Sequence, residues 1–174
     1  MLCLQQCDCK KSDVIPTPQP TPEVLPPITT TGANTFGCYV DGKLWLPFGG
    51  VTYPDLVGTY GSGHIYIYAD RNHINEVNST FTIEINKGVY AKGMYNLSFK
   101  NSLEGNSWYA YYIYNGLPDS NRYFVDTVNT GTLNLLRLDT ISFIMSGTFQ
   151  FNGYNKYLNK TVKITDGRFD IRYK

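Results

Sequence analysis

Hydrophobic and polar residues alternate with a period of two along most of the chain that follows Gly32. The clearest stretch runs from residue 141 to residue 151, and its apolar residues of one parity are Ile141, Phe143, Met145, Phe149 and Phe151. Serine, threonine and glutamine fill much of the other parity. Successive side chains of a β-strand point to opposite faces of the sheet, so this pattern predicts a long strand with one buried face.

Three shorter runs show the same alternation. Their apolar positions are Phe81, Ile83 and Ile85, then Val162 and Ile164, and finally Phe169, Ile171 and Tyr173. An apolar sheet face is stable only when a second layer covers it, so these runs predict packed β-layers.

Turn dipeptides separate the alternating runs. They are Asp41-Gly42, Asn115-Gly116, Asn152-Gly153 and Asp166-Gly167, and Asp139-Thr140 precedes the longest run. Asp-Gly and Asn-Gly tolerate the positive φ angles of tight hairpins. No stretch shows the 3.6-residue period of an amphipathic helix, so the predicted fold is all-β, an antiparallel β-sandwich or open barrel of about 8 to 10 strands.

The amino-terminal part of the chain has a different composition. Six of the nine prolines lie between Pro16 and Pro27. Proline lacks a backbone N–H and favours the extended polyproline II conformation. We therefore interpret residues 8–31 as a Pro-rich tether and residues 32–174 as the β-domain, with the alternative that the prolines are a ligand for another protein's groove.

The cysteines are unevenly placed, because Cys3, Cys7 and Cys9 crowd the first nine residues and only Cys38 lies in the body of the chain. This distribution excludes a disulfide framework for the domain. Cys38 shares a parity with Phe36, so we expect a buried, unreactive thiol there.

The run Leu4–Cys7 resembles the end of a bacterial lipoprotein signal, in which the cysteine of L-x-x-C is lipidated after cleavage. We therefore interpret residues 1–7 as the remnant of such a signal and Cys7 as the lipidated residue, with a lipid bilayer as partner. An ordinary frayed terminus is the alternative. The segment after Cys7 is not acidic, which favours the periplasmic side of the outer membrane over the cell surface.

The composition gives the chain a large aromatic content and almost no net charge. It has 15 Tyr, 9 Phe and 2 Trp, and its formal net charge is +1. This aromatic content can fill a sizeable core. The small charge gives no reason to expect a nucleic-acid partner.

Two blocks of sequence resemble a known family. They are G-A-N-T-F-G-C-Y-V-D-G-K-L-W (Gly32–Trp45) and the pair I-M-S-G-T-F-Q-F (Ile144–Phe151) and T-V-K-I-T-D-G-R-F-D-I (Thr161–Ile171). They look like an uncharacterised family of Bacteroidota lipoproteins. The resemblance implies a lipidated cysteine, a short linker and one β-rich domain, and it implies no particular reaction.

The residues offer little for catalysis. The two histidines, His64 and His73, lie in no context that nominates a nucleophile and a base. Asp70, Asn72 and Glu76 could build a calcium site, but they lack the spacing of an EF-hand loop. We therefore expect no catalytic residue, no cofactor and no metal.

Binding is the better functional hypothesis. Tyr66 and Tyr68 share one parity of a predicted strand, and Tyr109 and Tyr111 share one parity of another. If these four rings face solvent, they form a platform that stacks on sugar rings, with Arg71, Asn72 or Asn106 as hydrogen-bonding neighbours. The alternatives are cross-strand pairs that only stabilise the sheet, or an exposed edge strand that pairs with another envelope protein.

Two short motifs suggest modification. Asp126-Thr127-Val128 and Asp139-Thr140-Ile141 match the D-[ST]-aliphatic pattern of O-glycosylation in Bacteroidota. They predict sugars on Thr127 and Thr140 in an exported protein.

Overall fold

The computed structural model describes residues 23–48, 55–72, 77–99, 108–114 and 119–174. Its strands are β1 (Thr35–Val40), β2 (Lys43–Trp45), β3 (Leu56–Gly61), β4 (His64–Arg71), β5 (Ser79–Ile85), β6 (Gly93–Leu97), β7 (Trp108–Tyr114), β8 (Arg122–Phe124), β9 (Gly131–Asp139), β10 (Ile144–Asn155) and β11 (Lys160–Arg172). A single 3-10 turn, η2 (Asp119–Asn121), precedes β8.

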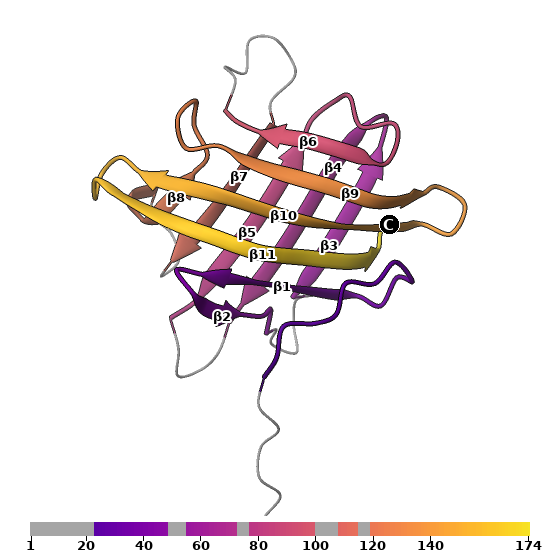
Figure 1. Ribbon diagram of the computed structural model, residues 1–174, viewed down its shortest axis with the longest axis horizontal. Helices are drawn as coiled ribbons and strands as arrows, with labels where there is room; N and C mark the ends of the chain where they lie inside the picture. Colours follow the sequence, from indigo (N-terminus) through magenta and orange to yellow (C-terminus); the bar gives the residue numbers. More distant parts are fainter. Residues whose placement is uncertain (1–22, 49–54, 73–76, 100–107, 115–118) are drawn as a thin grey trace, which may run out of the picture.

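All the named strands join in one antiparallel sheet that curls into an open half-barrel (Figure 1). The first layer contains β6, β9, β10, β11, β1 and β2, and the second contains β7, β5, β4 and β3. Strand β8 connects the layers because it pairs with both β7 and β10. The all-β prediction is therefore confirmed, with 11 strands in the described part where about 8 to 10 were expected.

The core lies between the two layers and is rich in aromatic rings. Phe81 is fully buried at its centre. Its ring centroid lies 4.6 Å from that of Trp45 and 4.9 Å from that of Tyr112. The predicted inward positions of β5, β10 and β11, and that of Tyr173 directly after β11, are buried: Phe81, Ile83, Ile85, Met145, Phe149, Phe151, Val162, Ile164, Phe169, Ile171 and Tyr173.

The start of the longest predicted strand was wrong. Ile141 is 89% exposed and Phe143 is 56% exposed with a φ of 55°, so β10 begins only at Ile144. The reason is the Asp139 carboxylate, which accepts hydrogen bonds from the N–H groups of Ile141 at 2.9 Å and Ser142 at 2.8 Å. These bonds stabilise a turn in place of the first strand residues.

The turn dipeptides have different outcomes. Asp41-Gly42 joins β1 to β2 with φ angles of 48° and 78°, as predicted for a tight hairpin. Asn152-Gly153 instead lies inside β10, where a Cβ at Gly153 would come within 2.9 Å of Tyr123 on β8. Asp166, with a φ of 52°, forms a bulge inside β11. Asn115-Gly116 lies outside the described residues.

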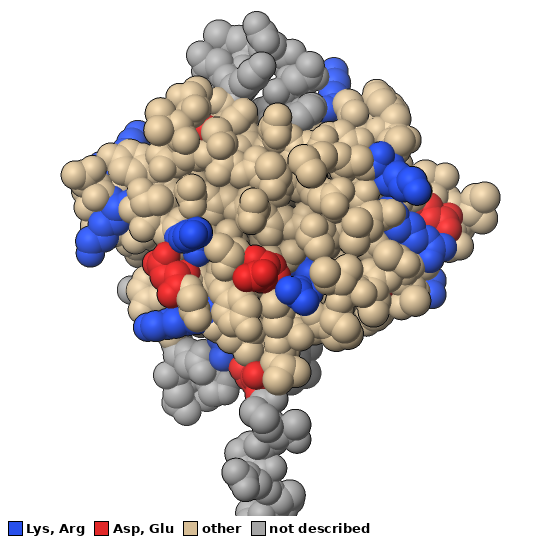
Figure 2. Space-filling view, in the orientation of Figure 1, with Lys and Arg blue, Asp and Glu red and all other residues tan. Residues whose placement is uncertain are grey.

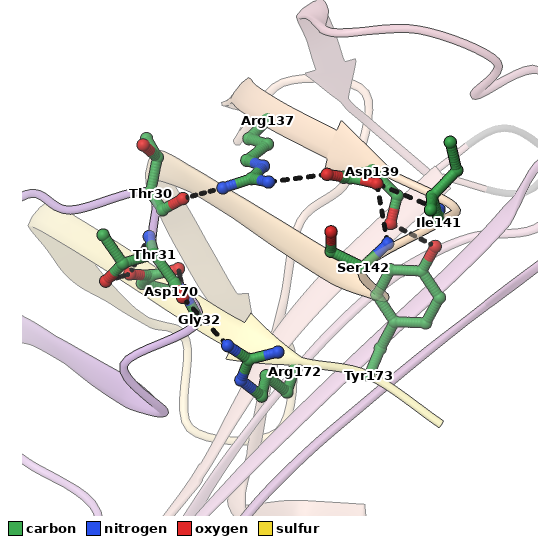
Figure 3. Close-up of polar contacts among 10 residues, drawn as sticks. All are labelled: Thr30, Thr31, Gly32, Arg137, Asp139, Ile141, Ser142, Asp170, Arg172 and Tyr173. Carbon is green, nitrogen blue, oxygen red and sulfur yellow. Dashed lines mark hydrogen bonds and ion pairs between the residues drawn. The ribbon is translucent and has the colours of Figure 1, made fainter.

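The segment before β1 is fixed to the outside of the first layer by Asp170, which is 1% exposed (Figure 3). One carboxylate oxygen of Asp170 accepts from the Thr29 hydroxyl at 2.7 Å and from the Thr31 N–H at 2.8 Å. The other accepts from the Gly32 N–H at 2.7 Å. We call these four residues the Asp170 cluster. It fixes the point where the amino-terminal segment meets the domain.

Three arginines add contacts to the same segment. Arg172 donates to the Thr31 carbonyl at 3.5 Å (Figure 3). Arg137 donates to the Thr30 carbonyl and, at 2.6 Å, to the Asp139 carboxylate (Figure 3). Arg168 donates to the Pro26 carbonyl at 3.3 Å. Figure 2 shows that acidic and basic side chains are interspersed on this face of the described domain, so it carries no broad region of one sign.

Candidate functional site

The tyrosines singled out in the sequence lie on the outer face of the second layer. Tyr66 and Tyr68 alternate along β4 with the fully buried Ile65 and Ile67, so they point away from the core. Tyr111 has the same relation to its neighbours on β7. All three rings are half-buried. We call Tyr66, Tyr68 and Tyr111 the tyrosine face.

The register of the strands brings these three rings together. Thr82 of β5 pairs with Tyr68 on one side and with Tyr111 on the other. Thr82 is only 1% exposed, although its side chain lies on the outer face. Tyr111 lies close enough to Tyr66 and to Tyr68 to raise the pKa of each. The tyrosine face is therefore a group of three neighbouring rings on one outer face of the sheet.

Burial and neighbouring phenols raise the pKa of two of these tyrosines, Tyr66 and Tyr68. Burial raises the pKa of Tyr66 and of Tyr68 above the usual value, and the neighbouring Tyr111 raises both further. The hydroxyl groups of Tyr66 and Tyr68 are therefore O–H groups at physiological pH, able both to donate and to accept hydrogen bonds.

Other side chains border the tyrosine face. Arg122 of β8 lies over the Tyr111 ring, 5.7 Å from its centroid, and the Phe124 ring lies 5.4 Å from it. At the other border, His64 Nε2 lies 3.1 Å from the Glu84 carboxylate. These contacts extend the aromatic surface to β8 and give it one polar edge.

The remaining predicted neighbours of the tyrosine face have other places. For Tyr109 the structure describes only the backbone, which pairs with Glu84. Arg71 has the opposite parity from Tyr66 and Tyr68 and points to the inner side of the sheet, so it was wrongly assigned to the platform. The Asn72 N–H donates to the Phe48 carbonyl. Asn106 lies outside the described residues.

The described residues of the two types most suited to catalysis are a buried cysteine and a histidine paired with a glutamate. Cys38 is fully buried, and burial raises the pKa of its thiol far above the usual range. The reactive thiolate is therefore inaccessible at Cys38, as expected for a core thiol. His64 pairs with Glu84, and His73 lies outside the described residues.

The suggested calcium ligands do not form a described site. The Asp70 carboxylate accepts from the Thr80 hydroxyl at 2.8 Å, and Glu76 lies outside the described residues. Within the described ranges, no group of three His, Cys, Asp or Glu side chains is close enough to hold a metal.

The two threonines of the D-[ST]-aliphatic motifs are exposed and lie in turns of the same type. The Asp126 carboxylate accepts from the Val128 and Asn129 N–H groups, just as Asp139 accepts from the two residues after Thr140. Thr127 and Thr140 each follow the capping aspartate, so glycosylation there stays a prediction on accessible turns. Cys7 lies outside the described residues.

The structure also shows a pocket that the sequence did not indicate. It opens between the two layers at the end where β2, β5, β7 and β8 meet, and its volume is about 650 Å³. Its aromatic lining comes from Trp45, Tyr112, Tyr114 and Tyr123. We call it the end pocket. Ser79, a polar residue with the inward parity of Phe81, is the one sequence signal that could have pointed to it.

The floor of the end pocket is a buried polar pair. Trp45 Nε1 donates to the Ser79 hydroxyl at 2.8 Å, and the two residues are 5% and 4% exposed. Burial raises the pKa of Tyr112 to about 12, although a hydrogen bond with Ser79 lowers it in part. The floor therefore presents neutral, oriented hydrogen-bonding groups beside aromatic rings.

No protein-family profile, no curated protein and no solved structure matches this chain. Among the described residues, no helix is long and apolar enough to cross a membrane.

Proposed function

We propose that this chain is a non-catalytic binding domain that a lipidated Cys7 holds at the bacterial cell envelope, and that its tyrosine face binds neutral glycan chains. The observation that carries the proposal is the outward, half-buried arrangement of Tyr66 and Tyr68 on β4 and Tyr111 on β7, with only β5 between the two strands. Rings packed in the core could not contact a ligand, and isolated exposed rings would not form a continuous surface.

The spacing of the rings suits an extended ligand. Tyr66 and Tyr68 are two residues apart on β4, which corresponds to about 7 Å along the strand. Tyr111 lies two strands away, about 9 to 10 Å across the sheet. A chain of a few sugar units can lie over such a surface, with its apolar ring faces on the phenol rings and its hydroxyl groups near the phenol oxygens.

The surroundings of the described cysteine and histidine support the role of a binding domain over that of an enzyme. The Cys38 thiol is buried, and His64 is engaged with Glu84 on the rim of the tyrosine face. Neither is next to a nucleophile–base arrangement of the kind that hydrolases use.

The role of the envelope anchor is supported by the path of the amino-terminal segment. The Asp170 cluster fixes Thr29–Gly32 to β11, so a pull from Cys7 would act on this point and not on the tyrosine face. The prolines of the tether expected over residues 8–31 favour polyproline II, which rises about 3 Å per residue and suits a spacer between lipid and domain. We place the domain on the periplasmic side of the outer membrane.

The test is affinity electrophoresis of the protein through gels that contain xylan, mixed-linkage β-glucan or mannan. We expect at least one of these neutral polysaccharides to retard the protein, and Tyr68→Ala to remove most of the retardation. Tyr39→Ala is the matched control, because Tyr39 is a half-buried tyrosine on β1 of the first layer, away from the tyrosine face. If none of the polysaccharides retards the protein, or if Tyr68→Ala and Tyr39→Ala behave alike, the proposal is wrong.

A further inference from the structure

The end pocket has the size and the lining of a small-molecule site. Its volume is about 650 Å³. Small-molecule sites have volumes of about 300 to 1,000 Å³, with mostly apolar walls and a few oriented polar groups. The end pocket has this composition, because aromatic rings surround the Trp45–Ser79 pair.

The rings are arranged at different depths. Trp45 and Tyr112 are nearly buried and form the floor, whereas Tyr114 is 50% exposed and lies at the mouth. Tyr123 is half-buried, with its ring centroid 6.3 Å from that of Tyr112. A six-membered ring that enters the pocket would contact Tyr114 and Tyr123 with one face and reach the polar floor with its edge.

The charges around the end pocket are mostly positive. Among the described residues that line it, Lys43 of β2, Arg71 of β4 and Lys160 of β11 are positive, and Asp41 has the one carboxylate. Asp41 already accepts a hydrogen bond from the Lys163 N–H at 2.7 Å. The described lining of the end pocket therefore has three positive side chains and one negative side chain. The whole chain has a net charge of only +1, so positive charge is concentrated at this pocket. A negatively charged ligand is favoured.

We propose that the end pocket binds a sugar ring that carries a carboxylate, such as a uronic acid. The ring lies between Tyr114 and Tyr123, and the carboxylate points to Lys43 and Lys160 at the mouth. Ring hydroxyl groups face the floor, where the neutral Tyr112 phenol offers a hydrogen bond. This site is on the inner side of the sheet, so the inference does not require that the tyrosine face bind glycans.

The test is saturation-transfer NMR on the full chain with D-glucuronate and D-glucose as probes. We expect saturation of glucuronate and much weaker saturation of glucose, and we expect the glucuronate affinity to fall several-fold as the salt concentration rises from 50 to 500 mM, because salt screens exposed charges. Tyr114→Ala and the double variant Lys43→Gln/Lys160→Gln should each weaken glucuronate binding about tenfold, which corresponds to the loss of about 1.4 kcal/mol.

Matched controls separate this site from the rest of the surface. Lys156 lies over the Tyr157 ring at 5.0 Å, outside the end pocket, so Lys156→Gln and Tyr157→Ala remove the same residue types elsewhere. These two variants and Tyr68→Ala should leave glucuronate binding unchanged. Equal binding of glucose, no saturation of glucuronate by the folded protein, or loss of binding in Tyr68→Ala would each overturn the assignment.

Discussion

Asp170 accepts several hydrogen bonds while almost completely buried, so its substitution tests how the amino-terminal segment is held. In Asp170→Asn the side chain keeps its shape, but one oxygen becomes an NH₂ group. Whichever way the amide turns, that group faces a donor, either the Gly32 N–H or the Thr29 hydroxyl and Thr31 N–H. At least one hydrogen bond is lost, and the remaining hydrogen bonds are made to a neutral acceptor in place of a charged one.

The magnitude follows from the bonds involved. A hydrogen bond to a charged group contributes about 1.5–3 kcal/mol, and an unsatisfied buried donor costs about 1–3 kcal/mol. The segment can partly move into water, which limits the loss. We therefore expect Asp170→Asn to lower the free energy of unfolding by about 2–4 kcal/mol.

Urea denaturation of the two proteins measures this difference, and amide hydrogen exchange locates it. In the variant, the N–H groups of Thr31 and Gly32 should lose protection. Asp166→Asn is the control, since Asp166 is an exposed residue of the same strand with a φ of 52°, which asparagine tolerates. A loss below about 0.5 kcal/mol in Asp170→Asn, or the same loss in both variants, would refute the reasoning, because surface changes have effects of about that size.

Further predictions concern pH, reactivity, packing and the anchor. Burial raises the pKa of Asp170, but hydrogen bonds from Thr29, Thr31 and Gly32 outweigh this effect and hold the pKa below its usual value. The stability that Asp170 contributes is therefore present above about pH 5 and is lost as the pH falls below about 4. The urea midpoints of wild type and Asp170→Asn should converge in acid, and a constant difference down to pH 2 would contradict this. In a chain whose other cysteines are serine, Cys38 should react with a thiol reagent only at the rate of unfolding, whereas fast labelling of the folded protein would show that the thiol is accessible. Gly147→Ala should cost about 1–3 kcal/mol, because its Cβ would come within 2.5 Å of a backbone carbonyl of β9, whereas Gly61→Ala meets nothing within 4 Å and should be nearly neutral in thermal unfolding. When the protein is expressed with its upstream codons, the intact mass from a membrane fraction should correspond to a chain that begins at Cys7 with added acyl groups; an unmodified soluble chain would remove the anchor from the proposal.

The strands of this fold could be predicted where the sequence alternates over a buried face. Phe81 on β5 and Phe169 on β11 were assigned to the core from parity alone, and both are buried. The prediction was wrong at Ile141 and Phe143, because the alternation of apolar and polar residues contains no information about the hydrogen bonds by which Asp139 forms a turn. A local polar contact there outweighs the burial of two apolar side chains.

The tyrosine face and the end pocket differ in how far the sequence could predict them. Tyr66 and Tyr68 could be placed on an outer face because they are two residues apart on one strand. The end pocket could not be predicted, because its lining comes from strands of both layers that are brought together only by the curl of the sheet. Arg71 illustrates the difference: its residue type suited the platform, but its parity directs it to the pocket.

The most direct test of glycan binding is to follow the backbone amide resonances while a neutral oligosaccharide from the polysaccharide that retards the protein is added. The account predicts chemical-shift changes centred on β4, β5 and β7 at Tyr66, Tyr68, Thr82 and Tyr111, with little change along β10 and β11. Shift changes centred on the first layer, or spread evenly over the domain, would contradict the assignment of the tyrosine face as the binding surface.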